Sequence, residues 1–142
     1  MLNISSTLSA IIATIGGAIS WLFGGFDILF LWLLIIMVLD ILTGLTESLY
    51  FKCSPKTNTG RFASSVFRVG LLHKGAILMV VVISVMVDHI TGLGLVRDIV
   101  VTFYLLEEAM SCLENLARCG LPLPKKLTDV LEVLQDKNDN IK

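Results

Sequence analysis

The stretch FDILFLWLLIIMVLDILTGL (residues 26–45) decides the fold, because it is long and apolar enough to form a membrane-spanning helix. Its only charged side chain between Asp27 and Glu47 is Asp40. A charge at the centre of a membrane helix costs about 2.5–3.5 kcal/mol on insertion scales, so such residues usually serve a function. Asp40 therefore indicates a helix contact, a water path or an assembly interface within a membrane protein.

The composition of the whole chain agrees with a membrane protein. Of its 142 residues, 55% are hydrophobic and only 16% are charged, whereas about a quarter of the residues in a soluble domain are charged. The net charge is −1, so no general basic field indicates nucleic-acid binding. The three cysteines are an odd number without a C-x-x-C spacing, which argues against a disulfide framework or a zinc site.

Four apolar segments predict an all-α, integral membrane fold with three to four transmembrane or membrane-embedded helices. We expect one membrane domain over residues 1–118, with helices at about 8–23, 26–50, 69–88 and 96–118. The first segment is barely long enough to cross a membrane. Residues 119–142 are expected to form a cytoplasmic tail with a short amphipathic helix.

A basic segment between the second and third helices predicts the orientation. From Tyr50 to Val87 the chain has no acidic residue, and basic loops stay in the cytoplasm. Both termini would be cytoplasmic if all four segments cross. The basic residues either bind anionic lipid headgroups or act through topology alone. They are Lys52, Lys56, Arg61, Arg68 and Lys74.

The fourth segment carries two stripes at helical spacing. One is apolar and has a heptad-like spacing, from Ile99 through Phe103 and Leu106 to Ala117. The other is polar and contains Glu107, Ser111, Glu114 and Arg118. Two interpretations remain open. The helix lies on the cytoplasmic membrane surface, or its polar face meets other helices or water within an assembly.

No catalytic motif is found in the chain. A nucleophile elbow, an HExxH sequence and a phosphate-binding loop are all missing from the sequence. We therefore expect a protein that is not an enzyme and that needs no cofactor or metal.

Several motifs follow one another in an informative order. They are DILTG (Asp40 to Gly44), SS followed by GLLHKGAIL (Ser64 to Leu78), Asp88, and EAMSCLENLARCGLPLPKKL (Glu108 to Leu127). The sequence resembles the toxin-secretion/phage-lysis holin family of Gram-positive bacteria and their phages. The most specific part of the resemblance comprises Glu108, Ser111, Glu114, Asn115, Gly120, Pro122 and Pro124.

The resemblance implies a protein that oligomerises in the bacterial cytoplasmic membrane. There it would form lesions that release a cell-wall endolysin, or in toxin operons a large toxin. The alternatives are an accessory or structural subunit of a membrane complex, and a narrow ion or proton channel. The candidates for helix contacts or for lining a lumen are Asp40, Gly44, Asp88, Glu107, Glu108, Ser111, Glu114 and Asn115. Gly120, Pro122 and Pro124 are expected to end the last membrane helix.

Overall fold

The fold is entirely helical in the residues that the computed structural model describes, which are 4–51, 63–127, 129–130 and 133. The predicted all-α membrane fold is confirmed. The helices are α1 (Ile4–Leu22), α2 (Ile28–Thr46), the π-helix η1 (Glu47–Phe51), α3 (Ser64–Thr91) and α4 (Val96–Arg118). Helix α3 begins before the expected residue 69, so it includes several residues that the sequence had assigned to a loop.

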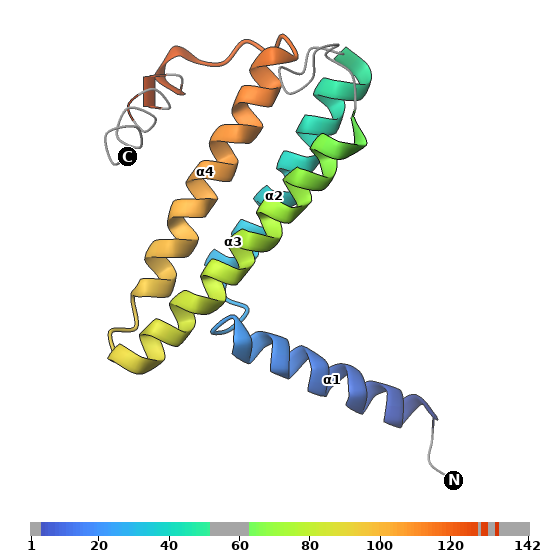
Figure 1. The fold of residues 1–142 in the computed structure, drawn as a ribbon, viewed down its shortest axis with the longest axis vertical. Helices are drawn as coiled ribbons and strands as arrows, with labels where there is room; N and C mark the ends of the chain where they lie inside the picture. The colour runs from blue at the N-terminus through green and yellow to red at the C-terminus, as the bar shows by residue number, and fades with distance from the viewer. Residues whose placement is uncertain (1–3, 52–62, 128, 131–132, 134–142) are drawn as a thin grey trace.

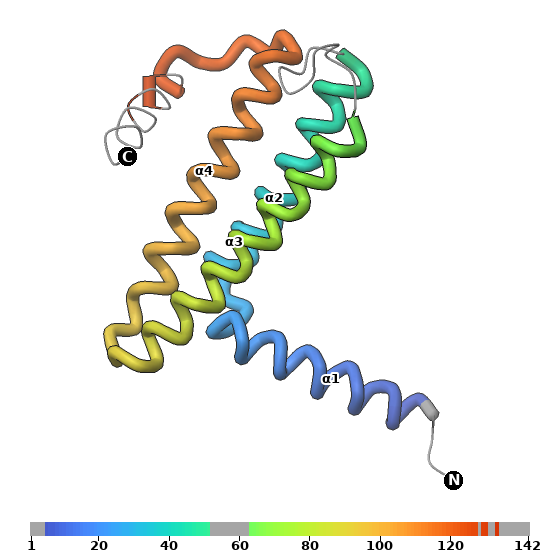
Figure 2. The backbone as a smooth tube through the Cα atoms, viewed as in Figure 1, coloured from blue at the N-terminus to red at the C-terminus, as the bar shows by residue number. Residues whose placement is uncertain are grey.

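Helices α2, α3 and α4 form a bundle, and α1 leaves this bundle at a steep angle (Figure 1). Within the bundle α2 and α4 run in the same direction and α3 runs in the opposite direction (Figure 2). Helix α4 packs along both α2 and α3. None of the described side chains of α1 is buried.

The core of the bundle is apolar in the half nearer the α1–α2 turn. Residues on the inner face of α2 recur at steps of three and four, a spacing that places them on one side of a helix. The contiguous buried apolar cluster of this half consists of Phe30, Leu33, Met37, Ile77, Val81 and Val101. On the same face of α2, the next positions are Asp40, Gly44 and Glu47. The inner face therefore changes from apolar to polar at Asp40.

Helix α4 has its apolar stripe on the outside of the bundle. Ile99 is 61% exposed and Phe103 is 46% exposed, while Glu108 and Asn115 are buried. The stripe that resembled a helix-packing interface in the sequence thus faces away from α2 and α3. A helix with an apolar outside and polar inside suits a lipid environment, where the exposed side chains meet hydrocarbon instead of water.

Three helical stretches in the described residues are long and apolar enough to cross a membrane. They are Ser5–Leu22, Ile28–Phe51 and Ser64–Thr91. Helix α4 carries too many charged residues to meet the same criterion. Its 23 residues nevertheless extend about 34 Å, which matches the thickness of a bilayer's hydrocarbon core.

Helix α4 ends in a Schellman motif. The N–H of Gly120 donates to the carbonyl of Ala117 at 2.9 Å, and the N–H of Leu121 donates to the carbonyl of Leu116 at 3.2 Å. Gly120 has a φ of 85°, a left-handed conformation that glycine adopts without strain. Pro122 and Pro124 follow in a stretch without regular secondary structure. The amphipathic tail helix extends into residues that lie outside the described part of the chain, and it stays a prediction.

Candidate functional site

Charged side chains from three helices meet inside the bundle. The Lys74 ammonium on α3 donates to the Asp40 Oδ2 atom on α2 at 2.8 Å, and it also donates to Oε2 of Glu108 on α4. The side chains of Lys74 and Glu108 are only 12% and 5% exposed. Asp40 lies near the middle of the span Ile28–Phe51. The ion pairs are therefore placed at mid-height of the bundle.

An amide completes this group on the α2–α4 side. The Asn115 Nδ2 atom donates to Asp40 Oδ1 and to the Thr43 hydroxyl, both at 3.2 Å. Asn115 is fully enclosed. A Cβ added at Gly44 would lie 3.6 Å from Asn115 Nδ2, which is ordinary contact, so space does not demand a glycine there. We call Asp40, Thr43, Lys74, Glu108 and Asn115 the polar cluster.

Within the polar cluster each buried charged or polar side chain has a partner, without which its burial would cost free energy. Removing one partner of a buried ion pair leaves an uncompensated charge and costs roughly 3–5 kcal/mol, although the intact pair itself adds little net stability. Lys74 forms ion pairs with two carboxylates, so its removal would leave both carboxylates without their cation. We therefore expect the cluster to fix the relative position of α2, α3 and α4 more than to add net stability.

Further polar contacts continue from the cluster to the η1 end of the bundle. Glu47, at the start of η1, is 1% exposed, and its Oε1 atom lies 3.6 Å from Nη1 of Arg118. Arg118 also pairs with Glu114 at 2.9 Å. π-helical turns inside or next to α-helices are frequent at functional sites. The α2–α4 interface is thus polar from Asp40 to its η1 end.

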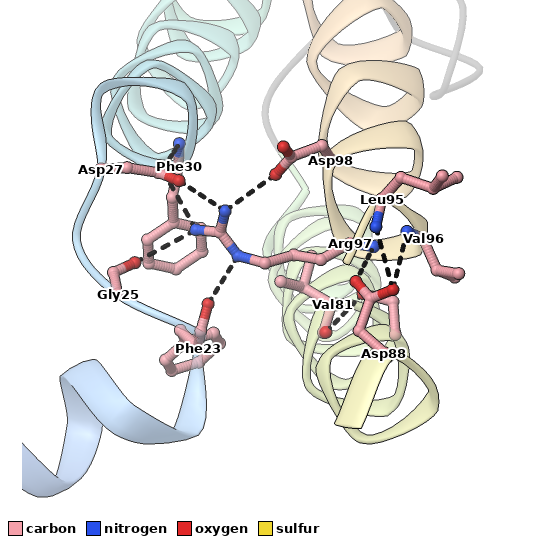
Figure 3. A network of polar contacts seen from close by, with 11 residues as sticks. Phe23, Gly25, Asp27, Phe30, Val81, Asp88, Leu95, Val96, Arg97 and Asp98 are labelled. Carbon is pink, nitrogen blue, oxygen red and sulfur yellow. Dashed lines mark hydrogen bonds and ion pairs between the residues drawn. The ribbon is translucent and has the colours of Figure 1, made fainter. Parts of the chain in front are cut away.

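A second network closes the opposite end of the bundle, and sequence reasoning did not identify it. The Arg97 guanidinium donates to the carbonyl oxygens of Phe23 at 2.7 Å and Gly25 at 3.1 Å, and it pairs with Asp27 (Figure 3). It also contacts Asp98 at 3.0 Å. These bonds attach the α1–α2 turn to the first turn of α4. The hydrogen bonds from Arg97 hold the pKa of Asp27 below its usual value.

Asp88 and Asp27 each stabilise the start of a helix. The Asp88 carboxylate accepts hydrogen bonds from the N–H groups of Leu95, Val96 and Arg97, at 3.1, 3.0 and 2.8 Å (Figure 3). Asp27 accepts from the N–H of Phe30 at 2.9 Å and caps α2. Asp88 was a candidate for a helix contact or a lumen, and here it organises the α3–α4 connection.

The structure brings together some of the predicted candidates and separates others. Asp40, Glu108 and Asn115 meet in the polar cluster, with Gly44 beside them. Glu107, Ser111 and Glu114 are partly exposed and lie outside it. Lys74 was expected at a membrane edge but lies ten residues into α3, where it contacts carboxylates. Arg68 is exposed, and Lys52, Lys56 and Arg61 lie outside the described residues.

The described residues contain no candidate metal site built from several ligands. In that part of the chain, no three or more His, Cys, Asp or Glu side chains are grouped to hold a metal ion. The polar cluster instead places side chains of opposite charge together between three helices, where they form ion pairs.

Comparison with known sequences identifies the family. A sequence model described as "Bacteriophage holin family" matches residues 17–136. The chain belongs to the bacteriophage holin family. The matched region includes α2, α3 and α4 completely but only the last part of α1. The family resemblance noted in the sequence is confirmed, and this family points to a membrane protein without enzymatic activity.

Relatives of this holin-family chain occur in bacteria and in a phage. An "Uncharacterized 14.9 kDa protein in nagH 3'region" of Clostridium perfringens is 34% identical over 139 residues, which cover 96% of this chain and 99% of the relative. A "Probable holin" of Bacillus phage phi105 is 33% identical over 121 residues, which cover 84% of this chain and 83% of the relative. No solved structure matches the chain.

Proposed function

We propose that this protein is a holin, which accumulates in the bacterial cytoplasmic membrane and forms lesions there. The lesions would release an endolysin that degrades the cell wall, or a toxin. The observation that supports this most strongly is the family match over residues 17–136, together with a probable phage holin among the relatives. The polar cluster inside an otherwise apolar bundle supports it independently, because membrane helices retain buried charges where function needs them.

In this proposal α2, α3 and α4 all cross the membrane. Helix α4 packs along α2 and α3, and its exposed stripe is apolar. A helix lying on the membrane surface would be separated from α2 over most of its length, which does not agree with the Asn115–Asp40 contact at mid-height. The segment 52–62 and the tail after Arg118 would then be cytoplasmic. An N-terminus on the same side requires α1 to cross as well, by turning at Gly24 and Gly25.

The lesion is proposed to be a homo-oligomer. Association in a membrane follows mass action, so it depends steeply on the amount of protein that accumulates. Small and polar side chains provide contacts between helices in lipid. Helix α1 has small residues such as Gly16, Gly17 and Ser20, and none of its described side chains is buried, so it is available for such contacts.

Lysis timing provides a direct test. The chain is expressed together with an endolysin that lacks an export signal of its own, and each protein is also expressed alone as a control. We expect abrupt lysis only when both are present, together with loss of membrane potential when the chain is present alone. Cells that keep their membrane potential and retain the endolysin would exclude a holin.

The two alternative functions give different results in liposomes. A holin releases cargo of protein size above a threshold amount of inserted chain. A narrow channel releases ions and never a protein, and an accessory subunit releases neither without its partner. Liposomes loaded with both a small dye and a labelled protein of endolysin size separate these outcomes.

A further inference from the structure

We propose that the lesion opens along the α2–α4 interface, so that the polar cluster, closed within one chain in this structure, comes to line the water-filled opening. This inference rests on the proposed holin function and specifies which surface lines the lesion. The alternative is that closed bundles assemble through their outward faces and surround water with them.

The distribution of polar side chains favours the inner face as the lining. A lesion that admits proteins must be lined by groups that water solvates well. On α4 the outward positions Ile99, Phe103 and Leu106 are apolar, whereas the inward positions Glu108 and Asn115 are polar. The outward faces of α2 and α3 are also apolar, with Trp32, Val38, Met79 and Ile83 exposed. The polar groups that a closed bundle shows at mid-height are few: His73 is exposed, and Glu107 and Ser111 are partly exposed.

Separation at the α2–α4 interface would expose a polar surface that extends from mid-height to the η1 end. Asp40 meets Asn115 at mid-height, and Glu47 meets Arg118 at the η1 end. Between them Thr43 contacts Asn115 through its hydroxyl. Separation of α4 from α2 would turn each of these contacts into a pair of water-exposed polar groups, in a row along the helix.

The energetics allow the interface to open. A buried ion pair gains little net stability over its solvated parts, because the attraction only offsets the loss of hydration. When water enters, Asp40, Lys74 and Glu108 recover their hydration, so little is lost at these positions. Breaking the same contacts in lipid without water is costly. The cluster thus holds a single chain closed in lipid but offers little resistance once water enters.

Cys112 reports directly on this opening. It is buried on the inner face of α4, between the positions of Glu108 and Asn115, and its Sγ atom lies 3.7 Å from the carbonyl of Ile36 on α2. A maleimide that cannot enter hydrocarbon reacts with this thiol only after water reaches it. The test uses a chain in which Cys112 is the only cysteine, with Cys53→Ser and Cys119→Ser.

A second single-cysteine chain provides the matched control. It carries Phe103→Cys together with Cys112→Ser, Cys53→Ser and Cys119→Ser, so the thiol lies on the outward stripe of the same helix. Both chains are expressed with endolysin and treated with the maleimide before and at the onset of lysis. We expect Cys112 to change from protected to labelled at onset, and the thiol at position 103 to stay protected.

The other outcomes overturn the inference. Labelling at position 103 with Cys112 protected means that the outward face lines the lesion. Endolysin release with both positions protected means that the lining lies elsewhere, and the holin function stands. Labelling at both positions means that α4 has left the bilayer.

A measurement in membrane vesicles tests the opening without relying on lysis. In the single-cysteine Cys112 chain, Lys74→Met removes the cation that holds the three helices together, whereas Lys126→Met makes the same change at an exposed position. We expect Lys74→Met to raise the labelling rate at least about tenfold, which corresponds to 1.4 kcal/mol in favour of the open form. Lys74→Arg should restore protection. Equal rates in all three variants, at equal amounts in the membrane, would contradict the inference even if the chain caused no lysis.

Discussion

At the scale of single residues, Lys74 is the side chain for which the structure differs most from the expectation based on the sequence. In the sequence it belongs to a basic segment and suggests a membrane anchor. In the structure it is 34 residues away from both Asp40 and Glu108 along the chain, yet it contacts both carboxylates. A single sequence does not reveal such pairing, because it arises only when three helices pack in a particular register.

The first prediction concerns the stability of this arrangement. Lys74→Met leaves two carboxylates without a cation, so we expect the free energy of unfolding in detergent micelles to fall by about 3–5 kcal/mol. Replacing all three members together, as Asp40→Leu, Lys74→Met and Glu108→Leu, should restore most of the loss, since no charge is then left unpaired. Thermal unfolding measured by circular dichroism compares both variants with Lys126→Met. A triple variant less stable than the single one would contradict this reasoning.

Gly24 supports a second prediction. Its φ is +72°, and an added Cβ would lie 3.0 Å from Cδ of Arg97 and 3.1 Å from a methyl group of Val85. Gly24→Ala should destabilise the bundle by about 1–2 kcal/mol through backbone strain alone. Gly17→Ala is the control, because a Cβ at Gly17 meets nothing within 4 Å and alanine favours a helix. Equal melting temperatures for the two variants would show that the α1–α2 turn does not need its left-handed residue.

A third prediction follows from the lowered pKa of Asp27. The hydrogen bonds from Arg97 favour the ionised carboxylate in the folded state, so the pKa lies below its ordinary value of 3.8. The resulting stabilisation is present above pH 3.8 and disappears as the pH falls through the lowered pKa. Melting temperatures between pH 7 and pH 2 should therefore fall less in Asp27→Asn than in the unchanged chain. Parallel curves for the two proteins would remove Asp27 from the acid response.

At the scale of elements, α4 shows what a single sequence can and cannot predict. Its helical nature and its end near Gly120 follow from periodicity and capping signals. The direction in which its faces point does not follow, because the usual expectation that apolar stripes face inward is reversed in lipid. Ile99 and Phe103 are outside, and Glu108, Cys112 and Asn115 are inside. Arg97 was missed because two of its partners are backbone carbonyls, which leave no trace in the sequence, and its partner Asp27 is 70 residues away along the chain.

The crossing of α4 gives a fourth prediction. In a chain whose native cysteines are replaced by serine, Lys125→Cys lies after α4 and Leu93→Cys lies in the α3–α4 connection. If α4 crosses, a reagent that cannot pass the membrane labels position 93 in intact cells and labels position 125 only after permeabilisation. Labelling of both positions, or of neither, in intact cells would place α4 on one side of the membrane. Ser9→Cys in the same assay locates the N-terminal end of α1.

At the scale of the whole molecule, the chain consists of a bundle and one helix that stands apart from it. The family match begins at residue 17 and so covers the bundle but little of α1. The described side chains of α1 are all at least partly exposed, so the bundle gains no buried core from them. We therefore expect α1 to contribute little to the stability of a single chain.

This division gives a fifth prediction. Replacing residues 5–15 by an unrelated apolar helix of equal length should change the free energy of unfolding in micelles by less than about 0.5 kcal/mol, as expected for exposed positions. Leu33→Ala, at a fully buried position of α2, should lower the melting temperature clearly because it leaves a cavity. A large loss of stability on replacing residues 5–15 would show that α1 packs on the bundle.

The change from an apolar to a polar inner face at Asp40 also has an electrical consequence. In an inserted chain, charges and dipoles occupy the core from the η1 end to mid-height. These groups raise the local dielectric constant there. The layer around Phe30, Leu33, Val81 and Val101 is apolar, and it lies between these groups and the Arg97 network at the other end of the bundle. We therefore expect a large share of the transmembrane voltage to fall across this apolar layer. The field there would be correspondingly stronger than in a uniformly apolar bundle.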